Sequence, residues 1–275
     1  MRRGDAADPL LRQVLPVVDE DREAPGFTAD PVGELAVVHG DGVLAKYHGR
    51  ALLVATGACA VHCRYCFRRH FPYDEEGLAG NDLEAALAAV AADPTIDEVI
   101  LSGGDPLLLP ERRLAALVER LAEIGHIRRL RLHTRMPVVL PERVDEDFVS
   151  WLATVPLPMV VVIHTNHANE IDENVTRALA VLRGAGAVLL NQSVLLAGVN
   201  DSAPALEQLC RRLGDRGVLP YYLHQLDRVA GAAHFEVDDA RALEIMEVLR
   251  ARLPGYLVPR LVREVPGAPS KVPVG

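Results

Sequence analysis

Three of the four cysteines lie within eight residues, in the stretch GACAVHCRYCFRRH (57–70), and they are Cys59, Cys63 and Cys66. Three close thiolates can bind three irons of a [4Fe–4S] cluster and leave the fourth iron open to a small molecule. A structural zinc site needs a fourth protein ligand, which His62 or His70 could supply. The spacing therefore predicts a metal centre and favours the cluster, with Cys3His zinc as the alternative.

A second motif, SGGDPLL (102–108), directly follows an apolar stretch. Its first four residues are Ser102, Gly103, Gly104 and Asp105. Adjacent glycines let a backbone approach a ligand closely and leave its amide and carbonyl groups free. Taken alone, the same residues also make an ordinary turn.

The chain has only two lysines, Lys46 and Lys271, among 29 basic residues. Lys271 lies near the C-terminus in VREVPGAPSKVP, between prolines and a glycine. A lysine near a chain end is ordinarily a solvated charge. A lysine held by such a turn can instead form a covalent bond with pyridoxal phosphate (PLP).

The elements that position these residues follow a regular alternation. Apolar, β-branched stretches predict buried strands at 51–56, 97–102, 127–134, 158–165, 187–196 and 218–226. Helical patterns occupy 81–93, which opens with Asn81 as a cap, and 111–124, 142–155, 173–186 and 203–217. This order predicts an α/β fold with parallel strands and right-handed crossovers. Six units are too few for an eight-unit barrel, so we expect an open partial (β/α)6 barrel with its chemistry at the carboxyl ends of the strands.

The pattern divides the chain into three parts. Residues 1–45 are expected to form an N-terminal segment of short helices and turns, and residues 46–230 to form the partial barrel. Residues 231–275 form a C-terminal extension, with a helix at about 238–252 and a proline-rich tail expected to run extended across a surface. The cysteine stretch and SGGDPLL each follow a predicted strand, which places both at the same edge of the barrel.

Composition narrows the function classes. The chain has 275 residues, of which 49% are hydrophobic and 24% charged, and this is typical of a globular protein. A net charge of −9 disfavours nucleic-acid binding. No apolar run is long enough to span a membrane, and the N-terminus has no secretory h-region. We therefore expect a cytoplasmic protein with no membrane partner.

Several stretches together resemble the radical S-adenosylmethionine (SAM) enzymes of the lysine 2,3-aminomutase family. They are KYHGRALLVATGACAVHCRYCFRRHFPY, SGGDPL, HTNHANE, LNQSVLL, PYYLHQLD and PGAPSK. The resemblance runs from about residue 37 to the C-terminus. It is closest to the subgroup that makes β-lysine for modification of elongation factor P, because of CFRRHFPY and the short tail after PSK.

The resemblance implies a radical SAM partial (β/α)6 barrel with a PLP-binding C-terminal extension. It also implies three cofactors: a [4Fe–4S] cluster, SAM and PLP. The implied cluster ligands are Cys59, Cys63 and Cys66, and the implied PLP lysine is Lys271. The residues implied to contact SAM or PLP are Arg50, Ser102, Gly103, Gly104, Asp105, His164 and Gln192.

The resemblance further implies how a substrate is held. Arg68 matches the residue that pairs with the substrate carboxylate, which suits the fork of a guanidinium. Asp227 and Glu264 match the acids that hold the ε-ammonium of lysine, although Glu264 replaces the family's usual Asp. His224 stands where other members have a tyrosine, which leaves its role open.

The implied reaction converts L-lysine to β-lysine, used for β-lysylation of elongation factor P. The implied partners are a one-electron donor such as flavodoxin or ferredoxin and, functionally, elongation factor P and its lysine ligase. Three alternatives remain open from the residues alone. They are aminomutation of free lysine for a metabolite, a radical SAM enzyme without PLP, and a non-catalytic zinc or iron–sulfur protein.

Overall fold

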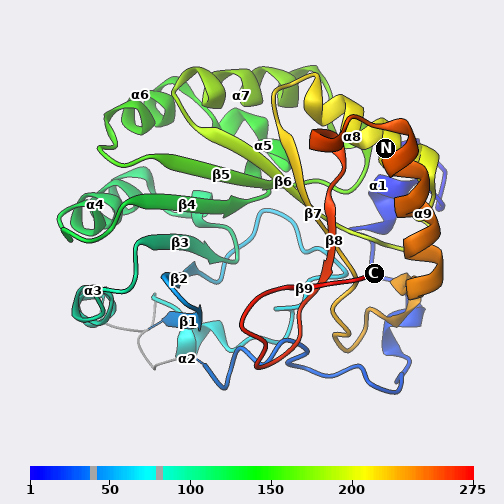
Figure 1. The fold of residues 1–275 in the computed structure, drawn as a ribbon, viewed down its shortest axis with the longest axis horizontal. Helices are drawn as coiled ribbons and strands as arrows, with labels where there is room; N and C mark the ends of the chain where they lie inside the picture. Colours follow the sequence, from blue (N-terminus) through cyan, green and yellow to red (C-terminus); the bar gives the residue numbers. More distant parts are fainter. Residues whose placement is uncertain (38–41, 79–82) are drawn as a thin grey trace.

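The computed structural model describes residues 1–37, 42–78 and 83–275. Within these residues, nine strands form one sheet in which each strand pairs with its neighbours in the chain (Figure 1). Strand β1 (Val43–Tyr47) is antiparallel to β2 (Arg50–Thr56). The strands that continue in parallel are β3 (Glu98–Gly103), β4 (Arg129–Thr134), β5 (Met159–His164), β6 (Val188–Val194), β7 (Leu219–His224) and β8 (Arg260–Arg263). The last strand, β9 (Val272–Pro273), is antiparallel to β8.

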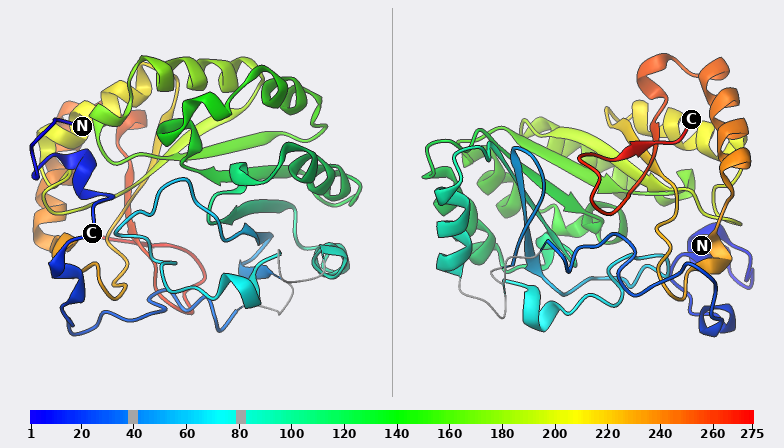
Figure 2. Two further views of the ribbon diagram at one scale, coloured as in Figure 1. Left: turned by 180° about the vertical axis from the view of Figure 1, so that it is seen from behind. Right: turned by 60° about the horizontal axis from the view of Figure 1, so that its bottom comes forward.

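Helices cover the outer face of the curved sheet (Figures 1 and 2). The long ones are α3 (Leu83–Ala92), α4 (Glu111–Ala122), α6 (Glu146–Thr154), α7 (Glu173–Gly184), α8 (Ala203–Gly214) and α9 (Asp239–Arg252). The short ones are α1 (Pro9–Arg12), α2 (Tyr73–Glu76) and α5 (Met136–Val139). The six predicted strands and the alternating helices are confirmed, so the predicted α/β partial-barrel class is correct. The Asn81 cap predicted for the first helix lies outside the described residues.

Local sequence explains where the helices begin. Asp145, Asp172 and Asp238 each accept a hydrogen bond from a backbone amide three residues ahead, at 2.8 to 2.9 Å. These side chains satisfy amides that a helix N-terminus leaves without a partner. The predicted helix at 142–155 therefore starts only at Glu146, after a 3₁₀ turn at Pro141–Arg143.

The main core lies between the sheet and the outer helices. Leu114, Leu117 and Leu121 of α4 recur at helical spacing and are buried. Burying each such side chain contributes about 1.5 to 3 kcal/mol. Strand β4 alternates instead: Leu130 and Leu132 face this core, while Arg131 and His133 face the inside of the curve. The sheet therefore presents an apolar outer face and a partly charged inner face.

The two chain ends contribute more to the sheet than the sequence pattern indicates. Strand β1 crosses the predicted boundary at residue 45. The proline-rich tail does not merely run across a surface, because β8 pairs with β7 and β9 pairs with β8. Pairing the tail in this way satisfies backbone groups that the free edge of β7 would otherwise expose. Both termini lie on the side of α8 and α9 (Figures 1 and 2).

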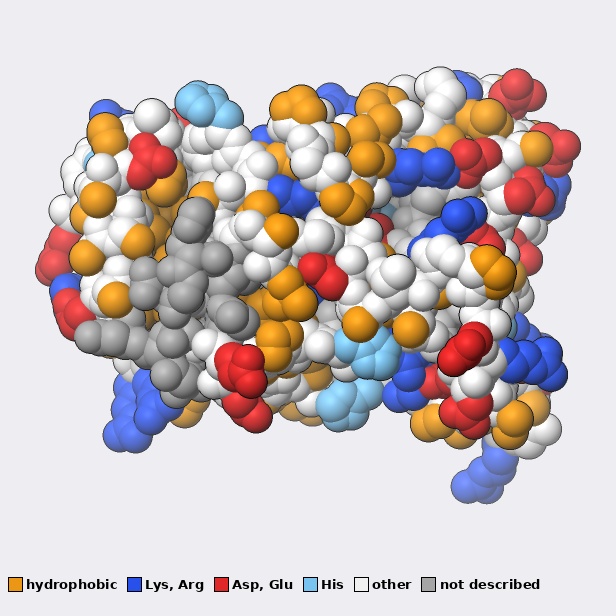
Figure 3. Space-filling view, turned by 90° about the horizontal axis from the view of Figure 1, so that it is seen from below, with side chains coloured by type: hydrophobic (Ala, Val, Ile, Leu, Met, Phe, Trp, Pro, Cys, Tyr) orange, Lys and Arg blue, Asp and Glu red, His pale blue; other side chains and the backbone are white. Residues whose placement is uncertain are grey.

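The surface seen from below carries side chains of both charge signs among apolar ones, and neither sign dominates it (Figure 3). No helix in the described part of the chain combines the length and the apolar character that a bilayer crossing requires.

Candidate active site

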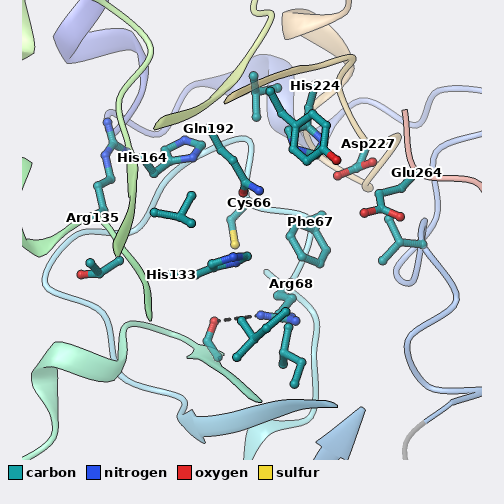
Figure 4. A pocket seen from close by; sticks show the side chains of 18 of the residues that line it. Cys66, Phe67, Arg68, His133, Arg135, His164, Gln192, His224, Asp227 and Glu264 are labelled. Atoms are coloured by element: carbon teal, nitrogen blue, oxygen red, sulfur yellow. Dashed lines mark hydrogen bonds between the residues drawn. The ribbon is translucent and has the colours of Figure 1, made fainter. Parts of the chain in front are cut away.

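One cavity of about 470 Å³ lies inside the curve of the sheet (Figure 4). Its walls come from the N-terminal segment, β1, the loop after β2, the inner faces of β2 to β7, the start of β8 and the C-terminal tail. The predicted site residues that line it are Arg50, Cys59, Cys63, Cys66, Arg68, Gly103, Gly104, Asp105, His164, Gln192, Asp227, Glu264 and Lys271. The fold thus brings residues from the whole length of the chain to a single cavity.

The three clustered cysteines are free thiols on the loop after β2, and each is partly buried. Burial and the neighbouring thiols raise the pKa of Cys59 to about 12 and that of Cys66 to about 11. His62 and His70 are exposed, and neither lines the cavity. In the described residues, no three His, Cys, Asp or Glu side chains gather around one point to hold a single metal ion. A cluster needs no such point, because each sulfur binds a different iron.

The SGGD motif packs against the cysteine loop. The Gly104 amide donates to the Thr56 carbonyl at 2.6 Å, and the Asp105 amide donates to the Ala58 carbonyl at 2.8 Å. A Cβ atom on Gly104 would lie 2.3 Å from the Ala58 oxygen, and one on Gly103 would lie 2.5 Å from the Thr56 oxygen. The glycines are therefore required for the close approach of these two backbones, whatever they also do for a ligand.

The Asp105 carboxylate is occupied by protein donors. It accepts hydrogen bonds from Thr134 Oγ1 at 2.7 Å and from the backbone amides of Arg135, Leu107 and Met136 at 2.7, 3.1 and 3.2 Å. Burial raises the pKa of this carboxyl even against these donors. Its visible role is to fix the turns that follow β3 and β4.

Arg135 contacts the cysteine loop, although the sequence did not predict it as a site residue. Its Nη1 donates to Cys63 Sγ at 2.7 Å, and its Nη2 donates to Glu170 Oε1 and Gln13 Oε1, each at 2.7 Å. The only signal in the sequence was an arginine directly after a predicted strand, in HTR. Gln13 is completely buried, so the N-terminal segment takes part in holding the cysteine loop.

His164, at the end of β5, belongs to the same network. Its Nε2 lies 2.8 Å from the Tyr65 hydroxyl, and the two rings stack. Burial, helped by the charge of Arg135, lowers the pKa of His164 to about 3, so the imidazole is neutral. Gln192, on β6, points into the cavity beside it (Figure 4).

Arg68 is held in a buried ion pair that the sequence did not reveal. Its Nε and Nη2 donate to the two carboxylate oxygens of Glu34, at 2.6 and 2.7 Å. Its Nη1 donates to Ser102 Oγ at 3.0 Å. Arg68 is 6% exposed and Glu34 8%. Ser102 is not among the residues that line the cavity, and its hydroxyl oxygen accepts this hydrogen bond from the guanidinium.

Lys271 reaches the cavity from the tail and is ion-paired with Glu264. Glu264 also accepts from Lys46 Nζ at 3.0 Å and from the Tyr47 hydroxyl. Burial alone would raise the pKa of Glu264, but the two lysines and the hydroxyl lower it to about 2. Lys271 Nζ also lies 5.7 Å from the centre of the Tyr222 ring.

Asp227 faces the same part of the cavity without a side-chain hydrogen bond or ion pair to any described residue. Burial, and then the negative charge of Glu264, raise its pKa to about 7. Asp227 and Glu264 lie on the same side of the cavity (Figure 4). Burial also lowers the pKa of His224 to about 3, which keeps that ring neutral.

His133 is a second residue of the cavity that the sequence did not predict. It projects between Cys66 and Arg68 (Figure 4), and its Nε2 is buried without a partner among the described residues. Burial and nearby cations, first Arg131, lower its pKa well below the ordinary value. The polar residues that alternate with leucines in IRRLRLHT were the available signal.

The fold and the cavity define a class of protein. Residues 53–150 match the model of the radical SAM superfamily. The structure is similar to that of a radical SAM methyltransferase from Sphaerobacter thermophilus, with a TM-score of 0.53 and 21% identity over 80% of this chain and 68% of that chain. This likeness shows the radical SAM fold. The superfamily implies a [4Fe–4S] cluster and SAM as cofactors.

Two bacterial relatives narrow the class. The chain is 52% identical over 274 residues to the L-lysine 2,3-aminomutase of Escherichia coli K12, covering all of this chain and 80% of that protein. It is 47% identical to the L-lysine 2,3-aminomutase of Haemophilus influenzae, over 98% of this chain and 80% of that protein. The chain therefore belongs to the lysine 2,3-aminomutase family of radical SAM enzymes, which are isomerases.

The residues present fit the implied groups. Three thiols on one loop, with a guanidinium donating to one of the sulfurs, suit an iron–sulfur cluster whose ligands are thiolates. The same cavity is lined by the amine of Lys271 and by two arginines that have no carboxylate partner among the described residues, which suits a phosphorylated aldehyde such as PLP.

Proposed function

We propose that this enzyme is a PLP-dependent 2,3-aminomutase that converts L-lysine to β-lysine for the β-lysylation of elongation factor P. The proposal includes a cytoplasmic location and a one-electron donor such as flavodoxin or ferredoxin. The observation that best supports this function is that some charged side chains in the cavity have no protein partner of opposite charge. In the described residues these are one carboxylate, Asp227, and two guanidiniums, Arg50 and Arg260.

When bound, the cluster and SAM supply a carbon radical able to take an unactivated hydrogen, and PLP supplies a π-system that carries the migrating amino group. The chain's own residues bind, orient and seclude the reactants. The cysteine loop and Lys271 line one cavity, so the groups that they hold share one enclosed space.

Asp227 supports lysine as the substrate. A carboxylate without a partner favours an ammonium group, and the arriving charge would lower the raised pKa of Asp227 and ionise it. Glu264 retains Lys46 as a counter-ion when Lys271 is joined to the cofactor. A glutamate side chain would meet two acids at this position, and like charges repel.

Arg68 stays in the proposal as the residue for the substrate carboxylate, with a restriction. Glu34 occupies Nε and Nη2, so a substrate can reach only Nη1, the nitrogen that now faces Ser102 and the Gly103 carbonyl. The proposed residues around SAM and PLP remain Arg50, Ser102, Gly103, Gly104, Asp105, His164 and Gln192.

The direct test is anaerobic reconstitution with iron, sulfide, PLP, SAM and a reductant, followed by chromatography of the amino acids. We expect a β-amino product from lysine and none from glutamate. Asp227→Lys is expected to abolish lysine turnover, whereas Asp215→Lys, at an exposed site that does not line the cavity, is not. Unchanged β-lysine formation by Asp227→Lys would refute the substrate assignment.

The two lysines give an internal control for the PLP site. After borohydride reduction of the PLP-loaded protein, peptide mapping is expected to find the pyridoxyl group on Lys271 and not on Lys46. The absorbance of bound PLP at the edge of the visible range is expected to be lost in Lys271→Ala. Protein that contains the cluster but retains no PLP would indicate a radical SAM enzyme without PLP, and one zinc without sulfide would indicate a zinc protein.

A coupled assay separates the role in translation from free-lysine metabolism. The β-lysine produced is offered to elongation factor P together with its lysine ligase, and mass spectrometry follows the modification. Efficient transfer at the product concentrations reached by the enzyme supports the proposed role. Product that the ligase does not accept favours a metabolic fate.

A further inference from the structure

We propose that His133 is a substrate-binding residue, and that its Nε2 and the Nη1 of Arg68 together bind the α-carboxylate of the amino-acid substrate. The inference rests on the proposed function, because that function supplies lysine as the substrate. His133 is on β4 and lines the cavity, where it projects between Cys66 and Arg68 (Figure 4). Its ring thus lies beside the guanidinium that the proposed function assigns to the carboxylate.

Arg68 by itself offers a carboxylate only one donor atom. Glu34 occupies its Nε and Nη2 at 2.6 and 2.7 Å, which uses the pair of nitrogens that could bind two oxygens side by side. The remaining Nη1 lies 3.0 Å from Ser102 Oγ. A carboxylate has two oxygens, and burying its charge is costly unless it is well hydrogen-bonded. A substrate carboxylate at Arg68 therefore needs a second donor from another residue.

His133 has an open hydrogen-bonding position next to Arg68. Among the described residues that line the cavity, three buried side-chain nitrogens have no hydrogen-bond partner: Arg131 Nε, His133 Nε2 and Arg135 Nε. The two arginines are ion-paired with Glu98 and Glu170, so their charges are compensated without a ligand. Buried polar atoms almost always have a partner. The imidazole nitrogen therefore marks a position that a ligand or an ordered water fills.

The imidazole can donate this hydrogen bond in its neutral form. Burial, and then the positive charge of Arg131, lower the pKa of His133 well below its ordinary value. A neutral imidazole has one N–H, and the hydrogen bonds of the ring decide which nitrogen carries it. A carboxylate oxygen at Nε2 is an acceptor and would hold the proton on that nitrogen. His133 Nε2 and Arg68 Nη1 then each donate to the carboxylate.

The two donors lie on fixed parts of the structure and away from Asp227. Strand β4 pairs with β3 on one side and β5 on the other, and His133 is in register with Val162 of β5. Arg68 is held in place by Glu34. Donors that are fixed before the ligand arrives reduce the entropy cost of binding. Figure 4 shows both donors well separated from Asp227, so a ligand that reaches all three has a carboxylate at one end and an ammonium at the other, as lysine does.

The test is anaerobic equilibrium dialysis of labelled ligands against enzyme reconstituted with iron, sulfide and PLP, without a reductant. L-Lysine is compared with 1,5-diaminopentane, which has the same two amines but no carboxylate. His133→Leu, which removes the donor, is expected to weaken lysine binding about 10- to 100-fold and to leave diaminopentane binding unchanged. His133→Gln, which keeps an N–H donor, is expected to recover part of the lysine affinity.

His126→Leu is the matched control, because the His126 ring contacts the Val90 carbonyl at 3.2 Å and does not line the cavity. It is expected to bind both ligands as the unaltered enzyme does. Equal lysine affinity of His133→Leu and the unaltered enzyme would overturn the inference. So would an equal loss for diaminopentane, or an equal loss of lysine affinity in His133→Gln.

SAM also carries an α-carboxylate, so its binding is measured in the same variants. If His133→Leu loses affinity for SAM and keeps its affinity for lysine, the residue serves SAM and the inference is overturned. If the unaltered enzyme binds neither lysine nor diaminopentane, the proposed function itself fails.

Discussion

The two ends of the cavity differ in how their charges are balanced. Around the cysteine loop, Arg68, Arg135 and Asp105 each contact two or more protein groups. Around Lys271, Asp227, Arg50 and Arg260 have no charged partner among the described residues. One end is held together by its own ion pairs and hydrogen bonds, and the other has charges that only a ligand or water can compensate.

The difference follows from the cost of burial. A buried charge is expensive unless it is paired and hydrogen-bonded, so an architecture that must remain fixed pairs its charges internally. Charges without partners persist where a ligand of opposite sign compensates them, and they mark what that ligand looks like. The comparison predicts that substitutions at the cysteine end chiefly affect folding, whereas those at the Lys271 end chiefly affect binding.

The largest effect is expected at Arg135. Replacing it by Leu leaves the Glu170 carboxylate buried without a cation, which costs about 3 to 5 kcal/mol. Anaerobic urea unfolding measures this loss. Arg120→Leu, which breaks an exposed pair with Glu84, is the control and should change little. If the two variants lose equal stability, the cysteine end does not depend on its buried ion pairs.

A smaller loss is expected from Gly104→Ala. The added Cβ would lie 2.3 Å from the Ala58 carbonyl oxygen, so either the SGGD turn or the cysteine loop must move. Overpacking of this kind costs about 1 to 3 kcal/mol. Gly125→Ala meets open space and serves as the control. Thermal unfolding and the iron content per chain are measured together. If Gly104→Ala keeps the Tm and the iron content of the unaltered protein, the close approach of the two backbones is not needed.

An effect of the opposite sign is expected from Asp227→Asn. The folded pKa of Asp227 is about 7, whereas an unfolded Asp titrates at about 3.9. The unfolded chain therefore releases its proton first, and the native state loses stability as pH rises from about 4 to 7. Asn removes this penalty, so the variant should gain Tm at pH 8 and gain almost nothing at pH 4.

A pKa raised from about 3.9 to about 7 corresponds to at most about 4 kcal/mol. The gain is therefore expected to reach roughly 10 °C, since each kcal/mol shifts Tm by about 2 to 4 °C in a chain of this size. Lysine turnover should fall in the same variant, because the uncharged amide no longer pairs with an ammonium. A variant that is both more stable and less active is the signature of a binding charge. A pH-independent difference in Tm would contradict the raised pKa.

The sequence by itself determined the elements that have strong local patterns. The strand at 97–102 and its neighbours could be predicted because buried parallel strands are nearly continuous in apolar residues. The cysteine loop and SGGD could be placed at one edge because parallel strands end together. Lys271 could be singled out because the chain has only two lysines. The short strands β1, β8 and β9 have too few residues to show a period, and only their pairing partners define them.

Only the tertiary structure decided which charges are satisfied. Arg68 and Glu34 are 34 residues apart in the chain, and Arg135 and Cys63 are 72 apart. A sequence gives the charge of each residue but not the distance to its counter-ion, and a Coulomb interaction depends on that distance. The same formal charges therefore became structural ion pairs at one end of the cavity and open binding positions at the other, once the sheet had curved around them.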